Sequence, residues 1–167
     1  IEGAMNPSSD TPTHLILYNR FPEIGGIVHT HSTYATAWAQ AGCSIPVYGT
    51  THADHLHCDV PCTRMMTDDR IEGDYEIETG RQITETFEPF DSAEVPMVLV
   101  AGHGPFTWGE TVEKAVYHAV VLEELAKMAF LTKCINPEST RLKETLIQKH
   151  YHRKHGPDAS YGQNNIE

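Results

Sequence analysis

The sequence predicts a layered fold of the α/β or α+β class, built around one sheet. Short β-branched segments that are typical of strands alternate along the chain with segments of helical character. Residues 96–101, PMVLVA, form an uninterrupted apolar run that is typical of a buried strand. The length of 167 residues suits one domain, and a hydrophobic share of 40% is sufficient for a core. We therefore expect one sheet with helices packed against it.

The first half of the chain contains two helices and two strands by these criteria. Pro12 suits the first turn of a helix that Asp10 or Thr11 can cap, and Gly42 suits the end of a second helix. The run GGIVHTH is bounded by glycines and is β-branched, which predicts a strand. The expected elements are a helix at 11–20, a strand within 25–31, a helix at 33–41, a strand at 45–48 and a polar, histidine-rich loop at 49–59.

The second half begins with a charged segment and ends in two helices. Gly156 and Pro157 form a stop signal for the last helix. A long helix is predicted before it. Its apolar face is expected to contain residues at helical spacing, namely Val112, Ala115, Val116, Ala119 and Val120. The expected elements are a helix in the second half of 69–88, a buried strand at 96–101, a strand at 106–108, a helix at 111–133 and a helix from after 137 to 155.

The composition argues against several classes of protein. The chain has 12 Lys and Arg against 23 Asp and Glu, and the net charge of −11 argues against a nucleic-acid-binding face. It contains no run of about 18 apolar residues, as a membrane span would require. The 4 cysteines have neither the number nor the spacing of a disulfide framework, so we expect free thiols in a reducing cytoplasm.

The pair His29 and His31 is the sharpest local signal among the 11 histidines. Residues two apart in a strand point to the same face, so both imidazoles can reach one metal ion. Neutral imidazole suits zinc. The alternative interpretation is two partly exposed polar residues at a strand end.

His103 is the natural third ligand, because it follows the buried strand and is flanked by Gly102 and Gly104. These glycines allow a sharp turn and leave space around the ring. Alternatively, the His103 side chain only forms a hydrogen bond with a backbone group at the turn. Three histidine ligands with an open coordination position would make a catalytic site.

The stretch HADHLH at residues 52–57 adds three histidines and Asp54, which could orient a ligand or act as a general acid or base. Most of these histidines are expected to be solvated. The sequence has no glycine-rich nucleotide-binding loop and no Gly-x-Ser-x-Gly motif. The residues alone therefore predict a soluble zinc enzyme with an open metal position.

Five motifs occur in order along the chain. They are PSSDTPTH at 7–14, GGIVHTHS at 25–32, GTTHAD at 49–54, HGPF at 103–106, and HYHRKHG at 150–156 with YGQ at 161–163. Together they closely resemble the class II aldolase family over essentially the whole chain. The third and fifth motifs are similar to its L-ribulose-5-phosphate 4-epimerase branch.

The resemblance implies a three-layer α/β/α fold with a central, mixed, mostly antiparallel sheet. It implies that residues 1–167 form a single domain that lacks roughly the first sixty residues of the family. It also implies a cytoplasmic homotetramer with C4 symmetry.

The resemblance further implies one zinc ion per subunit. His29, His31 and His103 match the zinc-binding histidines of the family. Asp10 matches an acidic residue beside the metal, where it would be a ligand close to the substrate. Taken alone, Asp10 would be interpreted as a helix cap, and one carboxylate could serve both purposes.

The resemblance assigns the acid/base roles to Asp54 and Tyr161, with Tyr161 contributed to the neighbouring subunit's site. On position alone, Tyr161 would be interpreted as a surface residue near a chain end.

The remaining matches concern the substrate and its phosphate. Ser8 and Ser9 match part of the phosphate site, although serines before a helix are usually turn residues. His150 and Arg153 match residues near the substrate, and both would otherwise be interpreted as solvated helix-end residues.

The implied activity is the epimerisation of L-ribulose 5-phosphate to D-xylulose 5-phosphate by retro-aldol cleavage and re-addition. One alternative is a class II sugar-phosphate aldolase of the fuculose- or rhamnulose-phosphate type, which releases its aldehyde product. A second alternative is a non-catalytic metal-binding paralogue.

Overall fold

A three-stranded antiparallel sheet forms the centre of the fold. The computed structural model of the chain describes residues 6–157 and 159. The strands β1 (Gly26–His29), β2 (Met97–Val100) and β3 (Gly104–Gly109) lie in the order β1-β3-β2. An isolated parallel bridge joins Cys62 to Leu99 on the outer edge of β2. The sheet is therefore mostly antiparallel, as predicted.

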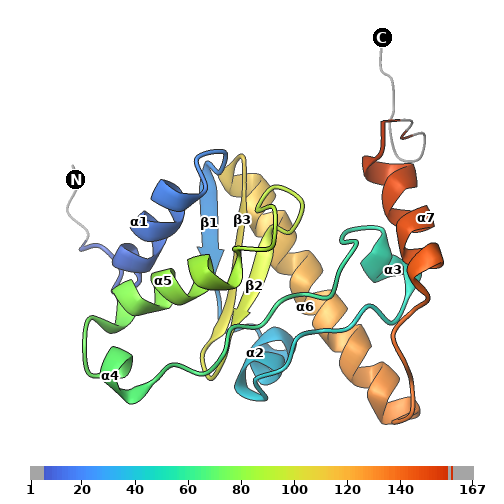
Figure 1. Cartoon of the computed structure of the whole chain (residues 1–167), viewed down its shortest axis with the longest axis horizontal. Coiled ribbons are helices and arrows are strands. Elements are labelled where there is room, and N and C mark those ends of the chain that lie inside the picture. The colour runs from blue at the N-terminus through green and yellow to red at the C-terminus, as the bar shows by residue number, and fades with distance from the viewer. Residues whose placement is uncertain (1–5, 158, 160–167) are drawn as a thin grey trace.

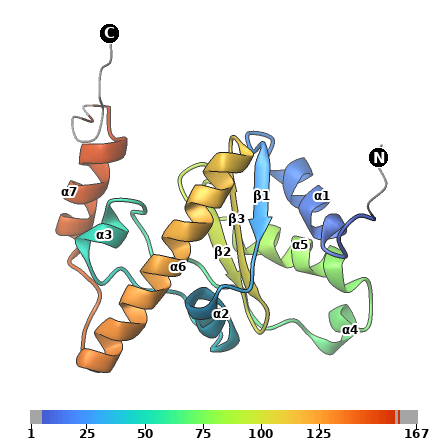
Figure 2. The ribbon, with the colours of Figure 1, turned by 180° about the vertical axis from the view of Figure 1, so that it is seen from behind.

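Helices cover both faces of this sheet, which confirms the three-layer α/β/α fold (Figures 1 and 2). On one side, α1 (Thr11–Arg20) packs against α5 (Tyr75–Thr86), which the short helix α4 (Asp68–Ile71) precedes. On the other side, α2 (Thr33–Gln40) and the long α6 (Val112–Ile135) pack against the strands and against each other. The main core lies between these layers and includes the fully buried Phe106 and Trp108.

A second, smaller unit projects from this body and is here called the α3–α7 arm. It consists of α3 (Thr50–Ala53) and α7 (Glu144–His155), which pack against each other around a small separate core of Val47, Ala53 and Ile147. The backbone N–H of Leu142 donates to the Val47 carbonyl at 2.7 Å. Figures 1 and 2 place the arm at the opposite end of the molecule from α1.

Two local expectations for residues 45–59 were wrong. Residues 45–48 do not form a strand: Ile45 makes only an isolated bridge to Val60. Pro46 has no N–H to donate, which explains why the pairing does not extend. The histidine-rich segment expected to be a loop contains the short helix α3.

The apolar face expected for α6 was right for Ala115, which is fully buried, and wrong for its three valines. Val112, Val116 and Val120 are 57%, 47% and 62% exposed. The buried residues of α6 are Ala115, Leu122, Leu125, Ala126 and Ala129. Among the described residues, no helix combines the length and the hydropathy that crossing a membrane requires.

Candidate metal centre and Asp54 cluster

The structure brings His29, His31 and His103, here called the histidine trio, to one point. Their candidate ligand nitrogens all lie within 4.8 Å of one another. The Nε2 atoms of His29 and His31 are 3.1 Å apart. His29 ends β1, His31 follows two residues later, and His103 lies in the turn between β2 and β3. The same-face geometry expected for the first pair is therefore present.

The turn between β2 and β3 places His103 beside β1 because both flanking residues are glycines. Gly102 has a φ of 74°, in the left-handed region where a side chain is strained. A Cβ at Gly104 would lie 3.0 Å from the carbonyl oxygen of Thr30 and 3.5 Å from Cε1 of His29. The glycines thus allow the close approach of the two ligand-bearing segments.

The segment after His31 is held by an acidic side chain from α6. The Glu123 carboxylate accepts hydrogen bonds of 2.9 Å from the backbone N–H groups of Tyr34 and Ala35 at the start of α2. A carboxylate at a helix N-terminus is favoured by the helix dipole. This contact fixes α2, and with it the loop that carries His31.

The ring of His29 is fixed by two contacts. Phe106, its cross-strand partner, stacks on it with a centroid distance of 4.1 Å and an interplanar angle of 18°. Nδ1 of His29 lies 2.9 Å from the Pro105 carbonyl oxygen and must carry the proton in order to donate to it. This tautomer leaves the Nε2 lone pair free to face the rest of the trio.

The electrostatic environment favours the neutral form of two of these histidines. Burial lowers the pKa of His29, although the hydrogen bond to the Pro105 carbonyl and the charge of Asp10 act in the opposite direction. Burial also lowers the pKa of His103, and the neighbouring His29 and His31 lower it further. Because metal ions bind neutral imidazole, the trio fits a divalent ion such as zinc.

Asp10 lies within electrostatic reach of the trio but is not among the residues whose ligand atoms converge there. It occupies the N-cap position of α1, yet its side chain makes no capping hydrogen bond. Its carboxylate instead accepts a bond of 3.3 Å from the Ser8 hydroxyl. Ser8 and Ser9 are both exposed just before α1.

The α3–α7 arm assembles a second group, here called the Asp54 cluster. The Asp54 carboxylate lies 2.9 Å from Nδ1 of His150, 3.2 Å from an Arg153 guanidinium nitrogen and 3.5 Å from Nζ of Lys154. Burial raises the pKa of Asp54, but the hydrogen bond from His150 and the charges of Lys154 and Arg153 outweigh it, so the pKa is lowered. Asp54 is therefore ionised at neutral pH.

The histidine trio and the Asp54 cluster form two separate groups within one protomer. The trio lies at the end of the sheet beside Asp10 at the start of α1, whereas the cluster lies on the arm at the other end of the molecule (Figure 1). Tyr161, the second predicted acid/base residue, lies outside the described residues.

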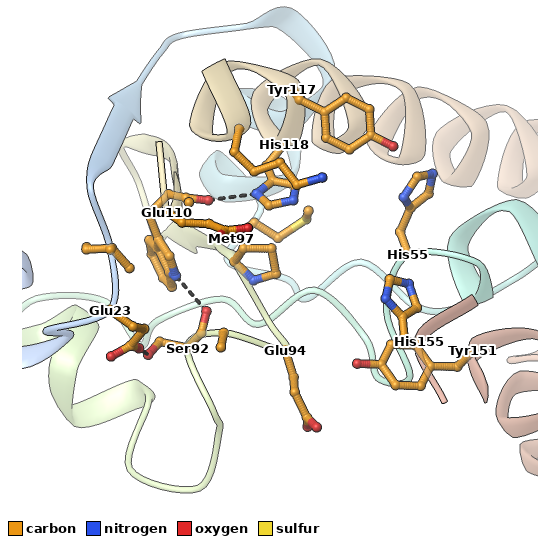
Figure 3. Close-up of a pocket in the computed structure, with 16 residues that line it drawn as sticks. Glu23, His55, Ser92, Glu94, Met97, Glu110, Tyr117, His118, Tyr151 and His155 are labelled. Atoms are coloured by element: carbon orange, nitrogen blue, oxygen red, sulfur yellow. Dashed lines mark hydrogen bonds between the residues drawn. The ribbon is translucent and has the colours of Figure 1, made fainter. Parts of the chain in front are cut away.

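A cavity of about 400 Å³ lies between the body and the arm (Figure 3). His55, Tyr151 and His155 lie on one side of it and His118 on the other (Figure 3). Nε2 of His155 lies 3.0 Å from the Asp54 backbone oxygen. The cavity therefore adjoins the Asp54 cluster and contains no member of the trio.

Two residues near the trio were not identified from the sequence. Phe106 stacks on His29, as described above, and the Tyr75 hydroxyl lies 3.1 Å from Nδ1 of His103. Phe106 falls within the HGPF motif, whereas Tyr75 lies in a charged segment without any metal-binding signature.

The fold and the trio define the class of protein, and comparison with known proteins agrees. Residues 1–130 match the family described as Class II Aldolase and Adducin N-terminal domain. The chain therefore belongs to the class II aldolase family.

Curated relatives identify a particular branch of this family. The chain is 52% identical over 163 residues to the L-ribulose-5-phosphate 4-epimerase UlaF of Salmonella paratyphi C (strain RKS4594). It has the same identity to the protein of the same name in Salmonella choleraesuis (strain SC-B67). The match covers 98% of this chain and 72% of the length of each relative.

Solved structures share the fold. An L-fuculose 1-phosphate aldolase superposes with a TM-score of 0.70 at 24% identity, covering 92% of this chain and 66% of that one. YgbL of Escherichia coli, described as a putative aldolase/epimerase/decarboxylase, gives a TM-score of 0.63 at 25% identity, covering 89% of this chain and 67% of its own.

Proposed function

We propose that the chain belongs to a zinc-dependent epimerase that converts L-ribulose 5-phosphate into D-xylulose 5-phosphate in the cytoplasm. The observation that carries this proposal is the convergence of the three histidine rings at one point. The identity of 52% to relatives named L-ribulose-5-phosphate 4-epimerase supports the substrate and the reaction. The proposal concerns the full-length protein, because the chain spans 72% of the length of those relatives.

The proposed zinc site consists of His29, His31 and His103, with Asp10 as a further ligand close to the substrate. Zinc, when bound, supplies a Lewis acid that stabilises negative charge on the substrate oxygens. Burial keeps His29 and His103 neutral and able to bind the ion. The Pro105 carbonyl keeps the His29 ring turned towards the site.

The proposed reaction is a retro-aldol cleavage followed by re-addition. One acid/base residue, Asp54 or Tyr161, removes the proton of the C4 hydroxyl, and the C3–C4 bond breaks. The products are the enediolate of dihydroxyacetone and glycolaldehyde phosphate. The aldehyde rotates to present its other face, the bond forms again, and the second residue returns a proton to the C4 oxygen. Two groups are needed because the hydroxyl lies on opposite sides before and after inversion.

We propose that the substrate is held by residues of both groups. Ser8 and Ser9 are exposed beside Asp10, and to donate to a phosphate the Ser8 hydroxyl would exchange its bond to the Asp10 carboxylate. His150 and Arg153 flank Asp54, and the positive charge of Arg153 would attract a phosphorylated sugar. This local charge is needed because the chain as a whole carries −11.

The proposed enzyme is a homotetramer in which each active site is completed by a neighbouring subunit. The separation of the trio from the Asp54 cluster within one protomer supports this assembly. We therefore extend the role assigned to Tyr161 and propose that Asp54 also acts on substrate bound at the neighbouring subunit's trio.

The first experiment measures D-xylulose 5-phosphate formation from L-ribulose 5-phosphate by the full-length protein with zinc. We expect Asp54→Asn to retain zinc and to lose turnover by about 10²–10⁴-fold. We expect His31→Ala to lose both zinc and turnover. Asp69→Asn, on the exposed start of α4, is a matched control and should behave like the wild type.

Other outcomes of this assay would favour the alternatives. Release of free glycolaldehyde phosphate without D-xylulose 5-phosphate would identify an aldolase. Tight zinc binding without either product would identify a non-catalytic metal-binding protein. Full turnover by Asp54→Asn would contradict the role proposed for Asp54.

The second experiment tests whether sites are shared between subunits. His31→Ala and Asp54→Asn subunits are unfolded together and refolded as a mixture. A site that combines the intact trio of one variant with the intact Asp54 of the other should recover up to roughly a quarter of wild-type activity, since subunits mix at random in a closed ring. No recovery from mixed tetramers would place both groups in the same subunit's site.

A further inference from the structure

We propose that Tyr75 is a positioning residue that holds His103 in the ring orientation and tautomer needed for metal binding. This inference rests on the metal site proposed above. The Tyr75 hydroxyl lies 3.1 Å from Nδ1 of His103. The two rings are inclined by 28°, with their centroids 6.1 Å apart. The contact therefore joins one specific nitrogen of a trio member to a hydroxyl group outside the trio.

The contact selects which nitrogen of His103 faces the trio. A neutral imidazole carries one proton, and a nitrogen that binds a metal ion must present its lone pair. With Nδ1 engaged by Tyr75, Nε2 is the nitrogen left for the ion. When Nε2 binds the ion, Nδ1 carries the proton and donates it to the tyrosine oxygen. His29 has the same arrangement, because its Nδ1–H donates to the Pro105 carbonyl. Partners of this kind raise the affinity of a histidine ligand.

The backbone around His103 explains why its ring needs such a partner. Both neighbours of His103 are glycines, and Gly102 takes a φ of 74°. A turn of this kind provides no side chains from adjacent positions to pack against the ring. Phe106 contacts the His103 ring only edge-on, at a centroid distance of 6.2 Å and an angle of 88°. The Tyr75 hydroxyl supplies a directional contact in addition.

Tyr75 itself is placed by elements that do not belong to this turn. It is the first residue of α5, and its carbonyl oxygen accepts a hydrogen bond of 2.9 Å from the Thr79 hydroxyl. The backbone carbonyl oxygen of the next residue, Glu76, accepts a hydrogen bond of 2.6 Å from the Thr13 hydroxyl of α1. Tyr75 is therefore anchored to the α1–α5 layer and can fix His103 relative to that layer.

The experiment uses the full-length Tyr75→Phe variant, which removes the hydroxyl and retains the ring. Zinc affinity is measured by competition with a chromogenic chelator at constant pH. We expect affinity to fall by about 10–100-fold, as for other partners of histidine ligands. Tyr48→Phe is the matched control, because this half-buried tyrosine lies outside both proposed groups, and its affinity should equal that of the wild type.

A second measurement separates positioning from a general effect on stability. Long-range ¹H–¹⁵N spectra of the metal-free protein report which nitrogen of His103 carries the proton. We expect the Nδ1–H form in the wild type and a mixture of both tautomers in Tyr75→Phe. The thermal midpoint of the metal-free variant should remain close to that of the wild type.

The failure of this inference can be distinguished from the failure of the proposed function. Wild-type zinc affinity and a single tautomer in Tyr75→Phe, with zinc binding lost in His31→Ala, would overturn only the role of Tyr75. Equal losses of affinity in Tyr75→Phe and Tyr48→Phe would also overturn it. Wild-type affinity in His31→Ala would overturn both proposals.

Discussion

His52 lies in α3, two residues before Asp54, and its side chain is almost entirely buried. The residue is 5% exposed, and its Nε2 lies 3.1 Å from the Cys58 carbonyl oxygen, to which it donates. Burial lowers the pKa of His52 to about 4, although the Cys58 carbonyl and the charge of Asp59 act in the opposite direction. Protonation of this ring must therefore oppose folding of the arm.

The size of this effect follows from the difference between the folded and unfolded pKa values. An unfolded histidine has a pKa of 6.5 and the folded one about 4, so the unfolded state takes up the proton first as the pH falls. The stability that neutral His52 contributes is complete above pH 6.5 and is lost as the pH falls through about 4. The loss amounts to about 2 kcal/mol at pH 5 and about 3 kcal/mol below pH 4.

The assay compares wild type with His52→Gln, whose amide can donate to the Cys58 carbonyl but cannot titrate. Free energies of unfolding are measured with denaturant at pH 7.5 and pH 5, with a chelator present and at one protein concentration, because bound metal and association also stabilise the fold. Other histidines titrate in both proteins, so the difference between the two curves isolates His52. If the free energy of unfolding fell by the same amount in both proteins between pH 7.5 and pH 5, the role of His52 would be refuted.

Two further predictions concern the sheet that carries the trio. Phe106→Ala removes a fully buried ring that also stacks on His29, and we expect a loss of about 3–5 kcal/mol in the free energy of unfolding, measured with denaturant. Gly26→Ala places a Cβ 2.5 Å from the Cα of Val112, so β1 and the start of α6 must separate. We expect a lower thermal midpoint and weaker zinc binding in this variant, and an unchanged midpoint would contradict the predicted clash.

Local signals in the sequence predicted most of the elements. Pro12 favours the start of α1, and Gly42, with a φ of 65°, favours the end of α2. Both effects arise from the backbone of the residue itself and do not depend on the rest of the fold. The buried strand at Met97–Val100 was also predicted from a local signal, because a run without polar residues has no side suited to face solvent.

Burial within α6 could not be predicted in this way. The helix is apolar around much of its circumference, so spacing does not distinguish the side that faces the sheet. The structure buries the small residues Ala115, Ala126 and Ala129. Ala126 lies against Trp38 of α2, whose indole N–H donates to the Ala126 carbonyl at 3.0 Å. The larger Val116 and Val120 remain exposed. The buried side depends on the strands and on α2, against which α6 packs, and the helix sequence does not contain their arrangement.

In the candidate site, too, local patterns in the sequence predict some contacts and not those between distant residues. The approach of His29 and His31 follows from two-residue periodicity, and both glycines beside His103 are visible in the sequence. The contact between Tyr75 and His103 joins residues 28 positions apart and follows no periodic pattern. Asp54 and His150 are 96 positions apart, and their contact was not predicted, although the family resemblance assigned both to the substrate site.

The division of the fold into two cores gives a physical reason for the active site that we propose is shared between subunits. The trio is built on the sheet, where cross-strand pairing fixes His29 opposite Phe106. Asp54 is built on an arm with its own small core, and Asp59 ties this arm together by accepting from Val47 N–H and from Arg141. Figure 1 places the arm at the other end of the molecule from α1, so bringing Asp54 to the trio of its own subunit would require the whole arm to move. In the proposed tetramer a second subunit presents Asp54, and neither core has to break.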